Sequence, residues 1–561
     1  MISQKALGGS TDPSAVRREG PPPGGGELAV VVLAAGRGER MGAGRKVLRQ
    51  VGGRAMLGHV FDAVEALRPS RIVVVTAGED DQVTRYAQER RDSSGLALDI
   101  AVQESQNGYG HALLAGLGEL GGFTGTIVVT CSDAPLLTPP TLRRLITEHE
   151  KSQNAMTLLS GWLREAPGYS LVVRSEVGEF EALTLPNSGS PREGDEPREV
   201  GAGVYAFDST ALRAAFEHLL SSGDASGEYL VAVAERFTGN GDRIGIATAE
   251  DSDDILGAND QGQLARVRAA LRDRLNRWWM AAGVEIIDPA TTWIDIDVSL
   301  EAGAVIHPHT HLRGTTTVQQ GASVGPGSDV RDSIVAAGAQ VVRSTVVGST
   351  IGARTVVEAY STLRGSVVGA DTSIANSVLE QASLGDGVNV GPYALLRPDT
   401  RLDDRAKAGT FVEIKNSHIG EGAKVPHLSY VGDADIGEGS NIGGLTAFAN
   451  YDGREKYRSI VGRNVRIGGQ NGIIAPVTVG DGAYSGGRAV ISKDVPPGAL
   501  VISEGSIKQR NIPGWVQKNR PGSASAVAAA MAQGDIADAP EPVGAQQQVP
   551  GVLPEEERPT S

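Results

Sequence analysis

A glycine- and arginine-rich segment, LAAGRGERM at residues 33–41, directly follows an apolar run that reads as a buried strand. Gly36 and Gly38 lack a Cβ, so the backbone can turn sharply and direct its N–H groups outward. Arg40 and Lys46 add positive charge. The segment lacks the third glycine of a dinucleotide fingerprint and the Gly-Lys-Ser/Thr of a Walker loop. We interpret it as an anion-binding turn of another kind, with an ordinary strand-to-helix turn as the alternative.

A second group of reactive side chains lies in the C-terminal half. His427 stands in the sequence between Lys415 and Tyr430, and Arg397 precedes them in LLRPDT. Histidine titrates near neutral pH and suits proton removal from an amine or hydroxyl, while lysine and arginine suit an anionic group. Together these residues fit a general base next to an anion site, although His427 taken alone is more simply a surface histidine. His418 lies in a plain turn, NSHIGEG, without such neighbours.

The composition limits the classes of protein. The chain has 561 residues, one cysteine (Cys131) and a formal net charge of −15. The length predicts at least two domains, and the acidic charge argues against a nucleic-acid-coating protein. Because no apolar stretch could cross a bilayer and none suggests a secretion signal, we expect a cytoplasmic protein without membrane partners. Residues 1–27 and 516–561 are rich in Gly, Pro, Ala and Gln, and we expect them to be disordered tails.

The N-terminal half alternates apolar runs with helical patterns. Strands are predicted at 28–34, 71–77, 98–103, 126–131 and 155–161, and a helix at 56–67. This alternation is typical of a mainly parallel sheet covered on both faces. Ligands bind such sheets at the carboxyl ends of the strands, where both the glycine-rich turn and TCSDAPL (130–136) lie. We therefore predict an α/β domain over residues 28–261 with its site at that edge.

After residue 286 the sequence period changes to six. Aliphatic residues recur at Val378, Leu384, Val390, Leu396 and Leu402, and again at Val461, Ile467, Ile473 and Val479. This repeat is typical of a parallel β-helix, in which three short strands make one triangular coil and the aliphatic residues stack inward. We predict this fold for 286–515, joined to the first domain by a linker helix within 262–285 that continues an amphipathic pattern over 264–278. A break in the rhythm at 443–459 predicts a loop that leaves the coil.

The motifs resemble those of one bacterial enzyme family. LAAGRGERM with KVL, NGYGHA and SDAPL resemble its nucleotide-binding segments, and LRP, VEIK, HLSYVGDADIG, NIGG, NYDG and APVTVG resemble its acetyltransferase half. Over residues 28–515 the chain is thus similar to the bifunctional N-acetylglucosamine-1-phosphate uridylyltransferase/glucosamine-1-phosphate N-acetyltransferase. The resemblance implies a Rossmann-like nucleotidyltransferase domain, a left-handed β-helix, a homotrimer, and synthesis of UDP-N-acetylglucosamine for peptidoglycan precursors.

For the first domain the resemblance implies uridylyl transfer from UTP to N-acetylglucosamine-1-phosphate. Arg40 and Lys46 would neutralise the phosphates, because this transfer needs charge neutralisation and positioning rather than a covalent group. Asp133 and Asn259 would hold Mg²⁺, which prefers oxygen ligands. The remaining residues implied to contact the nucleotide or the sugar are Leu33, Ala34, Ala35, Gly36, Gln103, Gly108, Tyr109, Ser170 and Gly201.

For the second domain the resemblance implies acetyl transfer from acetyl-CoA to glucosamine-1-phosphate. His427 would take the proton from the amine that attacks the thioester. The residues implied to hold the sugar phosphate are Arg397, Lys415, Tyr430, Asn441 and Lys456. Those implied to contact acetyl-CoA are Gly444, Asn450, Tyr451, Gly469 and Gly487.

Several positions of the first domain depart together from the family pattern. Tyr109 replaces a threonine, Ser170 a glycine, Leu185 a glutamate and Gly201 an asparagine. Because the sugar-side contacts are lost while the metal and phosphate residues remain, we expect a weakened or re-purposed uridylyltransferase. The alternatives are an acetyltransferase with a degenerate first domain and a non-enzymatic sugar-nucleotide-binding trimer. The grouping around His427 argues against the latter.

Three histidines alternate in HPHTH, at His307, His309 and His311. A strand would place all three on one face. Three-histidine zinc sites of hexapeptide-repeat carbonic anhydrases take their ligands from separate coils and adjoining subunits, so a metal role is not the favoured interpretation here.

Overall fold

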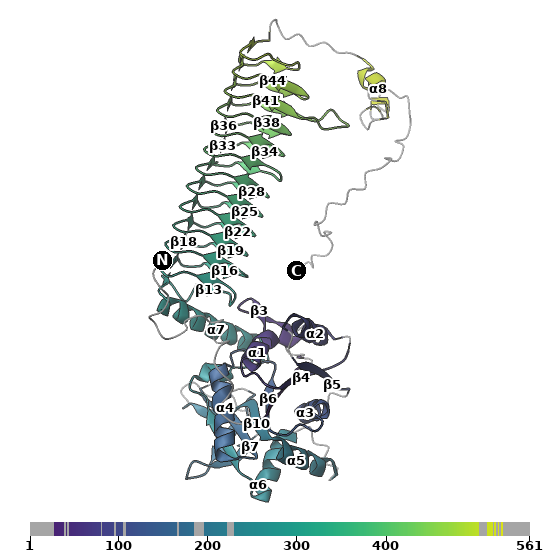
Figure 1. Ribbon diagram of the computed structural model, residues 1–561, viewed down its shortest axis with the longest axis vertical. Helices are drawn as coiled ribbons and strands as arrows, with labels where there is room; N and C mark the ends of the chain where they lie inside the picture. Colours follow the sequence, from purple (N-terminus) through teal and green to yellow (C-terminus); the bar gives the residue numbers. More distant parts are fainter. Residues whose placement is uncertain are drawn as a thin grey trace, which may run out of the picture. The chain divides into compact units, whose positions relative to one another are not determined.

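The structure of the chain is a computed structural model (Figure 1). It describes residues 27–36, 38, 41, 44–79, 81–94, 97–104, 108–164, 168–184, 196–221, 229–503, 513–519, 521–522, 526 and 529–530. Arg40, Leu185 and most of both predicted tails lie outside these residues. The chain divides into two compact units, residues 1–381 and 382–561, and each is described by itself. Within the described part of the chain, no helix combines the length and apolar character needed to cross a bilayer.

The first unit contains a sheet with helices on both faces (Figure 1). Its strands lie in the order β11 (Ile244–Thr248), β7 (Met156–Leu163), β10 (Arg198–Asp208), β6 (Thr126–Cys131), β1 (Leu28–Leu33), β4 (Arg71–Thr76) and β5 (Leu98–Val102). β10 runs antiparallel to both neighbours, and the other neighbouring pairs are parallel. A hairpin of β8 (Leu171–Arg174) and β9 (Phe180–Thr184) extends from β10. The predicted mainly parallel sheet is confirmed.

Two apolar cores lie on opposite faces of this sheet, because alternate side chains of a strand point in opposite directions. Val30 and Val32 of β1 pack with one set of helices, and Val31 and Leu33 with the other. The first set is α1 (Met56–Glu65), α2 (Gln82–Ser94) and α4 (Pro139–Ser152). The second set is α3 (Gly108–Glu119), α5 (Ser209–Ser221) and α6 (Tyr229–Asn240). This double cover leaves the carboxyl edge of the sheet as the place where polar side chains gather.

A long helix, α7 (Gln261–Ala281), follows the sheet. It begins at Asp260, whose side chain accepts a hydrogen bond from the backbone N–H of Gln263 at 2.8 Å. Its apolar face forms a third core with Met41, Val51, Met56, Leu136 and Ala258 of the sheet domain. The amphipathic helix predicted over 264–278 is therefore confirmed and is three residues longer at each end.

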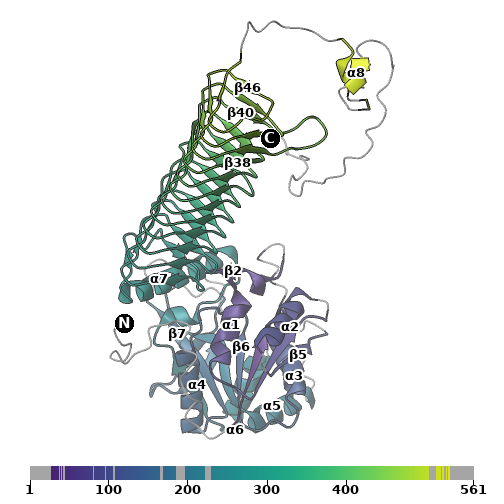
Figure 2. The same cartoon turned by 45° about the horizontal axis from the view of Figure 1, so that its top comes forward.

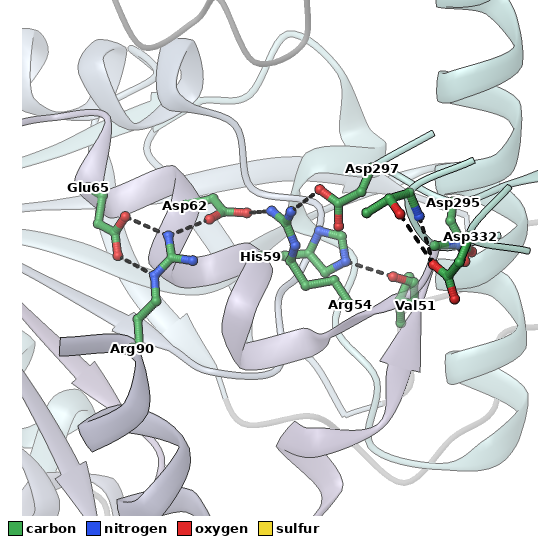
Figure 3. Close-up of polar contacts among 11 residues, drawn as sticks. Val51, Arg54, His59, Asp62, Glu65, Arg90, Asp295, Asp297 and Asp332 are labelled. Carbon is green, nitrogen blue, oxygen red and sulfur yellow. Dashed lines mark hydrogen bonds and ion pairs between the residues drawn. The ribbon is translucent and has the colours of Figure 1, made fainter. Parts of the chain in front are cut away.

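Ion pairs join the sheet domain to the first coil that follows α7 (Figure 3). Arg54, on β3 (Arg54–Ala55), contacts the carboxylates of Asp62 in α1 and Asp297 beyond α7. Nearby, the Nε2 atom of His59 lies 2.7 Å from the carbonyl oxygen of Val51, and burial lowers the pKa of this imidazole. Gly53, at φ +81°, turns against the Asp295 side chain so closely that a Cβ would overlap it. These contacts fix the start of the coils within the first unit.

From β12 (Glu285–Ile286) to β28 (Val378–Glu380) the first unit consists of strands of two or three residues in three parallel sheets. One inward aliphatic side chain per strand is buried, as the repeat predicts. The prediction for Val378 is wrong by one residue. Leu379 is the fully buried residue and pairs in register with the equally buried Leu363. The cause is that some steps between inward residues, such as Ile374 to Leu379, are five residues long rather than six.

The second unit continues such strands from β29 (Ser383–Leu384) to β47 (Leu500–Val501). The predicted loop at 443–459 is too long, because Phe448 on β40 (Ala447–Ala449) is 1% exposed and keeps the six-residue step after Ile442. Only residues 450–458, between β40 and β41 (Ser459–Val461), leave the coil, and they project beside β40 in Figure 2. The unit boundary at 381 does not test the predicted domain bounds, which stay a prediction.

Candidate active sites

The first candidate site is a cavity of about 240 Å³ at the carboxyl edge of the sheet. It is lined by Leu33, Ala35, Gly36, Lys46, Val47, Gln103, Gly108, Tyr109, Ala112, Cys131, Ser132 and Asp133. Eight of these twelve were predicted from the sequence. The glycine-rich turn after β1 and the TCSDAPL segment after β6 therefore meet, as expected for neighbouring parallel strands. Arg40 lies outside the described residues.

Lys46 is the positive centre of this cavity. Its ammonium contacts the Asp133 carboxylate and donates a hydrogen bond to Oδ1 of Asn259 at 2.9 Å. Gly38, at φ +66°, passes directly over the Lys46 side chain, where any Cβ would overlap the lysine Cβ. This close approach explains the need for glycine at position 38. Lys46, Asp133 and Asn259, predicted from distant parts of the sequence, are thus brought together.

One wall of the cavity contains Gln103, whose side chain is almost fully buried. Its amide nitrogen donates to the carbonyl oxygen of Gly108 at 3.2 Å, and its backbone N–H bonds to Thr76. Tyr109 stands next to Gly108 with 53% of its surface exposed. Gln103, Gly108 and Tyr109 therefore line one part of the cavity, and the contact of Gln103 and Gly108 with a nucleotide base stays a prediction.

The predicted sugar-side residues Ser170 and Gly201 lie together but are not among the lining residues of this cavity. The N–H of Gly201 donates to the carbonyl oxygen of Ser170 at 2.9 Å. A Cβ at Gly201 would lie 3.6 Å from the nearest side-chain atom, Cδ2 of Leu183, which is ordinary contact. The backbone here has room for a side chain. Leu185 lies outside the described residues.

A buried ion pair holds the β8–β9 hairpin near these residues. Arg174 donates two hydrogen bonds to the Glu199 carboxylate, each 2.6 Å long, and the Ser160 hydroxyl donates a third at 2.6 Å. Burial alone would raise the pKa of Glu199, but the hydrogen bonds from Arg174 and Ser160 outweigh it and lower that pKa. The hairpin is thus fixed to β10 by charge as well as by strand pairing.

Tyr169 directly precedes Ser170 in the sequence but was not recognised as a site residue. Its hydroxyl accepts a hydrogen bond from the N–H of Gly257 at 2.7 Å and donates to the carbonyl oxygen of Ile255 at 3.2 Å. Burial raises the pKa of Tyr169 to about 12. Because the N–H of Ala258 also bonds to the Asp133 carbonyl oxygen at 3.1 Å, Tyr169 helps hold the segment that presents Asn259.

The second candidate site is a cavity of about 580 Å³ in the second unit. It is lined by Arg397, Pro398, Asp399, Lys415, Asn416, Asp433, Lys456, Tyr457 and Arg458. Arg397 follows β31 (Leu395–Leu396), Lys415 ends β34 (Glu413–Lys415), and Lys456 comes from the 450–458 loop. The lining contains four basic side chains and two carboxylates, and Arg397 and Arg458 also pair with Glu413 and Asp435. Guanidinium and ammonium groups are suited to binding an anion. The three predicted phosphate-binding residues therefore converge.

His427 is the last residue of β36 (Lys424–His427). One corner of the coil separates it from the next strand, β37 (Tyr430–Gly432). Its ring lies against the Gly444 backbone, where a Cβ would be 2.5 Å from Nε2. Backbone hydrogen bonds then link Gln470 to Gly444 and Arg488 to Gly469, at 2.8 and 2.9 Å. The predicted acetyl-CoA residues Gly444, Gly469 and Gly487 therefore follow one another along a single corner that begins at the His427 ring.

The two predicted sugar residues lie on different sheets of the coil: Tyr430 is on β37, between this corner and Asp433 of the second cavity, and Asn441 is on β39 (Asn441–Ile442). The Tyr430 hydroxyl and the Asn450 amide both approach the Cα of Gly432, where a Cβ would be 2.6 Å from Cζ of Tyr430 and 2.9 Å from Nδ2 of Asn450. Asn441 begins β39, opposite Lys424. Tyr451 bridges to Lys456 within the loop.

Sequence reasoning missed Asp433 at the floor of this cavity. Its carboxylate accepts hydrogen bonds from Nδ2 of Asn416 at 2.6 Å and from Nδ2 of Asn450, and lies 3.5 Å from Nζ of Lys415. Burial alone would raise the pKa of Asp433, but the Asn416 and Asn450 hydrogen bonds and the Lys415 charge lower it. Asp433 stood in the quoted HLSYVGDADIG motif, and its left-handed backbone (φ 51°) was not visible from the sequence.

Two expectations about histidines need correction. His418 begins a strand, β35 (His418–Ile419), rather than lying in a turn, and its Nε2 lies 2.6 Å from Oδ2 of Asp403, which follows the neighbouring strand β32 (Arg401–Leu402). His307, His309 and His311 do not share one strand face: His309 is at φ 58° in a turn, and only His311 belongs to a strand, β16 (His311–Arg313). Among the described residues, no group of three His, Cys, Asp or Glu side chains is placed to hold a metal ion.

Comparison with known proteins gives the class and then the family. Residues 30–232 match the MobA-like NTP transferase domain, so the sheet domain is a nucleotidyltransferase domain. The bifunctional protein GlmU of Streptomyces avermitilis is 44% identical over 506 residues, which cover 90% of this chain and 97% of that protein. The proteins of the same name from Streptomyces coelicolor and Mycobacterium leprae are each 42% identical, over 89% and 90% of this chain and 96% of each relative. The chain belongs to the GlmU family, the bifunctional enzymes of UDP-N-acetylglucosamine synthesis.

Proposed function

We propose that the second site acetylates glucosamine-1-phosphate with acetyl-CoA and that His427 is its general base. The observation that carries this proposal is the convergence of Arg397, Lys415 and Lys456 on one cavity, which lies at the end of β37, the strand that follows His427. The basic groups would bind the sugar phosphate by charge, while Tyr430 and Asn441 would contact the sugar. Gly444, Asn450, Tyr451, Gly469 and Gly487 would contact acetyl-CoA.

The reaction follows from these positions. An ammonium group cannot attack a thioester, because its lone pair carries the proton, so His427 takes that proton. The free amine then bonds to the thioester carbon, and the carbonyl oxygen becomes an oxyanion that nearby N–H donors stabilise. The intermediate collapses, the C–S bond breaks, and the proton held by His427 passes to the CoA thiolate.

For the first site we propose uridylyl transfer from UTP to N-acetylglucosamine-1-phosphate, at a reduced rate or with altered sugar preference. The Asp133 carboxylate and the Asn259 carboxamide oxygen both reach the ammonium of Lys46, so they are close enough to share one small cation. They fit Mg²⁺, which would neutralise phosphate charge. Lys46, and Arg40 from outside the described residues, would bind the phosphates. Leu33, Ala34, Ala35, Gly36, Gln103 and Gly108 would contact the nucleotide.

The altered sugar side of this site supports the reduced rate. Gly201 offers no side chain and leaves open space, Ser170 contacts Gly201 through its backbone, and Tyr109 is a large exposed ring where the family has threonine. Hydrogen bonds to sugar hydroxyls would be lost at these positions, while the phosphate and metal groups are retained.

We also propose a homotrimer formed through the β-helix, in a cytoplasmic protein whose reduced single cysteine and small metabolite substrates suit that location. An exposed apolar ladder supports the trimer. It consists of Tyr393, Phe411, Leu428 and Leu445, which are 57%, 56%, 48% and 52% exposed at equivalent corners of consecutive coils. Such a contiguous apolar surface is typical of an interface, and it adjoins the proposed acetyl-CoA corner. Light scattering after size exclusion should give three times the chain mass; a fully active monomer would contradict it.

The test of the acetyltransferase proposal uses the full chain. Thiol release from acetyl-CoA should be fast with glucosamine-1-phosphate and much slower with glucosamine, because the sugar alone lacks the anion. Arg397→Ala should reduce this preference by raising KM for the phosphorylated sugar. Equal rates with both sugars, or no thiol release, would contradict the proposal.

A further inference from the structure

The loop at residues 450–458 depends on one residue at both of its ends. Its first side chain, that of Asn450, donates a hydrogen bond to the Asp433 carboxylate. The first residue after the loop, Ser459, donates its backbone N–H to the Asp433 carbonyl oxygen at 3.0 Å. Because both ends meet at Asp433, this residue closes the loop at its base.

The same residue also holds the opposite wall of the cavity. The N–H of Asp433 donates to the Lys415 carbonyl oxygen at 3.0 Å, and its carboxylate accepts from Nδ2 of Asn416 at 2.6 Å. The ammonium of Lys415 lies 3.5 Å from Oδ2. Lys415 and Asn416 belong to the coil before Asp433, whereas Asn450 belongs to the coil after it. The Asp433 side chain therefore joins three consecutive coils.

The burial of Asp433 makes these contacts interdependent. The residue is 6% exposed, and a buried carboxylate is costly unless hydrogen bonds and positive charge satisfy it. Asn416, Asn450 and Lys415 supply those partners. If Asn450 moved away with the loop, the Asp433 carboxylate would lose a hydrogen bond. This loss disfavours a displaced loop.

We propose that Asp433 is a positioning residue. It couples Lys415, which would bind the sugar phosphate, to the loop that carries Asn450, Tyr451 and Lys456. This inference rests on the acetyltransferase function proposed above. The coupling brings the amine and the thioester into reach of each other, because each of the two substrates is held by a part that Asp433 fixes. Misplacement of reacting groups by about 1 Å costs on the order of 10²-fold in rate.

The test compares Asp433→Asn with a matched control, Asp481→Asn. Asparagine keeps the size of Asp433 but turns one oxygen into a donor that faces the donors of Asn416, Asn450 and Lys415. Asp481 also accepts a backbone and a side-chain hydrogen bond, both from Arg463, but it is exposed and does not line the cavity. In Asp433→Asn, KM should rise several-fold for both substrates, and kcat/KM should fall by about 10²-fold. The pH profile should keep its shape, and Asp481→Asn should match the parent.

A second measurement reports the loop without activity. The loop contains three trypsin sites, Arg454, Lys456 and Arg458. Trypsin should cut it at least several-fold faster in Asp433→Asn than in the parent or Asp481→Asn, at an unchanged melting temperature. If Asp433→Asn proves unstable, Asn450→Asp replaces it, since two facing carboxylates should also release the loop.

The outcomes separate this inference from the function on which it rests. A parent that releases no thiol would contradict the acetyltransferase, and the coupling with it, even where trypsin shows an anchored loop. An active parent whose Asp433→Asn variant changes KM for only one substrate, or resists trypsin as the parent does, would overturn the coupling alone.

Discussion

The two sites of this chain keep the charged groups proposed to bind phosphate and metal, and they differ in the residues proposed to contact the sugar. In the first site Lys46, Asp133 and Asn259 remain together, but the sugar side has Gly201 and Ser170 in place of the family residues. The second site brings Arg397, Lys415 and Lys456, three of the five residues proposed to hold the sugar phosphate, to one cavity. We therefore propose that the first site is the more altered of the two.

The difference follows from how the two kinds of contact work. A phosphate is bound by full charges and by charge-assisted hydrogen bonds, and loss of one group removes a large part of the binding. A sugar hydroxyl is bound by neutral hydrogen bonds worth about 1 kcal/mol each, so such contacts can be lost one at a time while the fold stays intact. The losses proposed at positions 109, 170 and 201 are of the second kind, whereas Leu185 stands where the family has a glutamate.

The largest expected effect is on the rate of acetyl transfer at the second site. His427→Ala should lower the rate of thiol release by roughly 10²–10⁴-fold, the usual contribution of a positioned base. KM for glucosamine-1-phosphate should change little, because Arg397 and Lys415 still bind the phosphate. Steady-state assays of the parent and the variant across pH provide the measurement.

His418→Ala is the matched control, since His418 is close in sequence but pairs with Asp403. It should retain nearly the full rate. The assignment fails if His427→Ala keeps most of its rate with an unchanged pH profile, which would favour Tyr430 or a water-mediated route.

The second effect concerns acid stability and should be confined to the sheet domain. Burial lowers the pKa of His149 to about 4, against 6.5 when exposed. The contribution of neutral His149 to the free energy of unfolding is therefore fully present above pH 6.5. Up to about 3 kcal/mol of it is lost as the pH falls from 6.5 to 4, because the unfolded chain binds the proton first. Urea unfolding of the full chain, followed by helical circular dichroism at pH 7 and pH 5, should show the loss.

His149→Gln should flatten this pH dependence, since glutamine does not titrate. The Nδ1 atom of His149 lies 3.1 Å from the Thr157 hydroxyl, a contact that an amide can replace. An equally steep pH dependence in the variant would assign the acid sensitivity to another group.

The third effect separates the metal from the sugar. Asp133→Ala should weaken binding of Mn²⁺, used as a probe for Mg²⁺, by at least about 10-fold, because one of two proposed oxygen ligands is lost. Electron paramagnetic resonance of free Mn²⁺ gives the affinity directly, and thiol release should stay at the parental rate. Unchanged Mn²⁺ binding would exclude Asp133 as a ligand.

The smallest effect is a gain in the altered site. Gly201→Asn fits the open space next to Leu183 and should restore one hydrogen bond to the sugar. A gain of about 1 kcal/mol corresponds to roughly a fivefold rise in kcat/KM for N-acetylglucosamine-1-phosphate. The double change with Leu185→Glu should raise it further, and pyrophosphate release is the readout. No gain in either variant would mean that the sugar side is not the cause of a low rate.

The sequence predicted the elements better than the contacts between them. Continuous apolar runs, a 3.6-residue pattern and a six-residue repeat revealed the sheet, α7 and the coils, and strand ends at one edge predicted the meeting of Lys46 and Asp133. Five-residue steps misled the prediction at Val378, since a shortened turn leaves no signal of its own. Asp433 was missed because its role depends on the stacking of three coils, which brings together residues up to 35 positions apart.

The most direct test of the contrast between the sites measures both steps on one preparation of the full chain. Thiol release from acetyl-CoA with glucosamine-1-phosphate is compared with pyrophosphate release from UTP with N-acetylglucosamine-1-phosphate and Mg²⁺, each at saturating substrate. If the first site is the more altered of the two, the acetyl step should be faster, and the uridylyl step should be slow but Mg²⁺-dependent. Comparable turnover in the two assays would contradict the claim that the substitutions at positions 109, 170, 185 and 201 impair the first site.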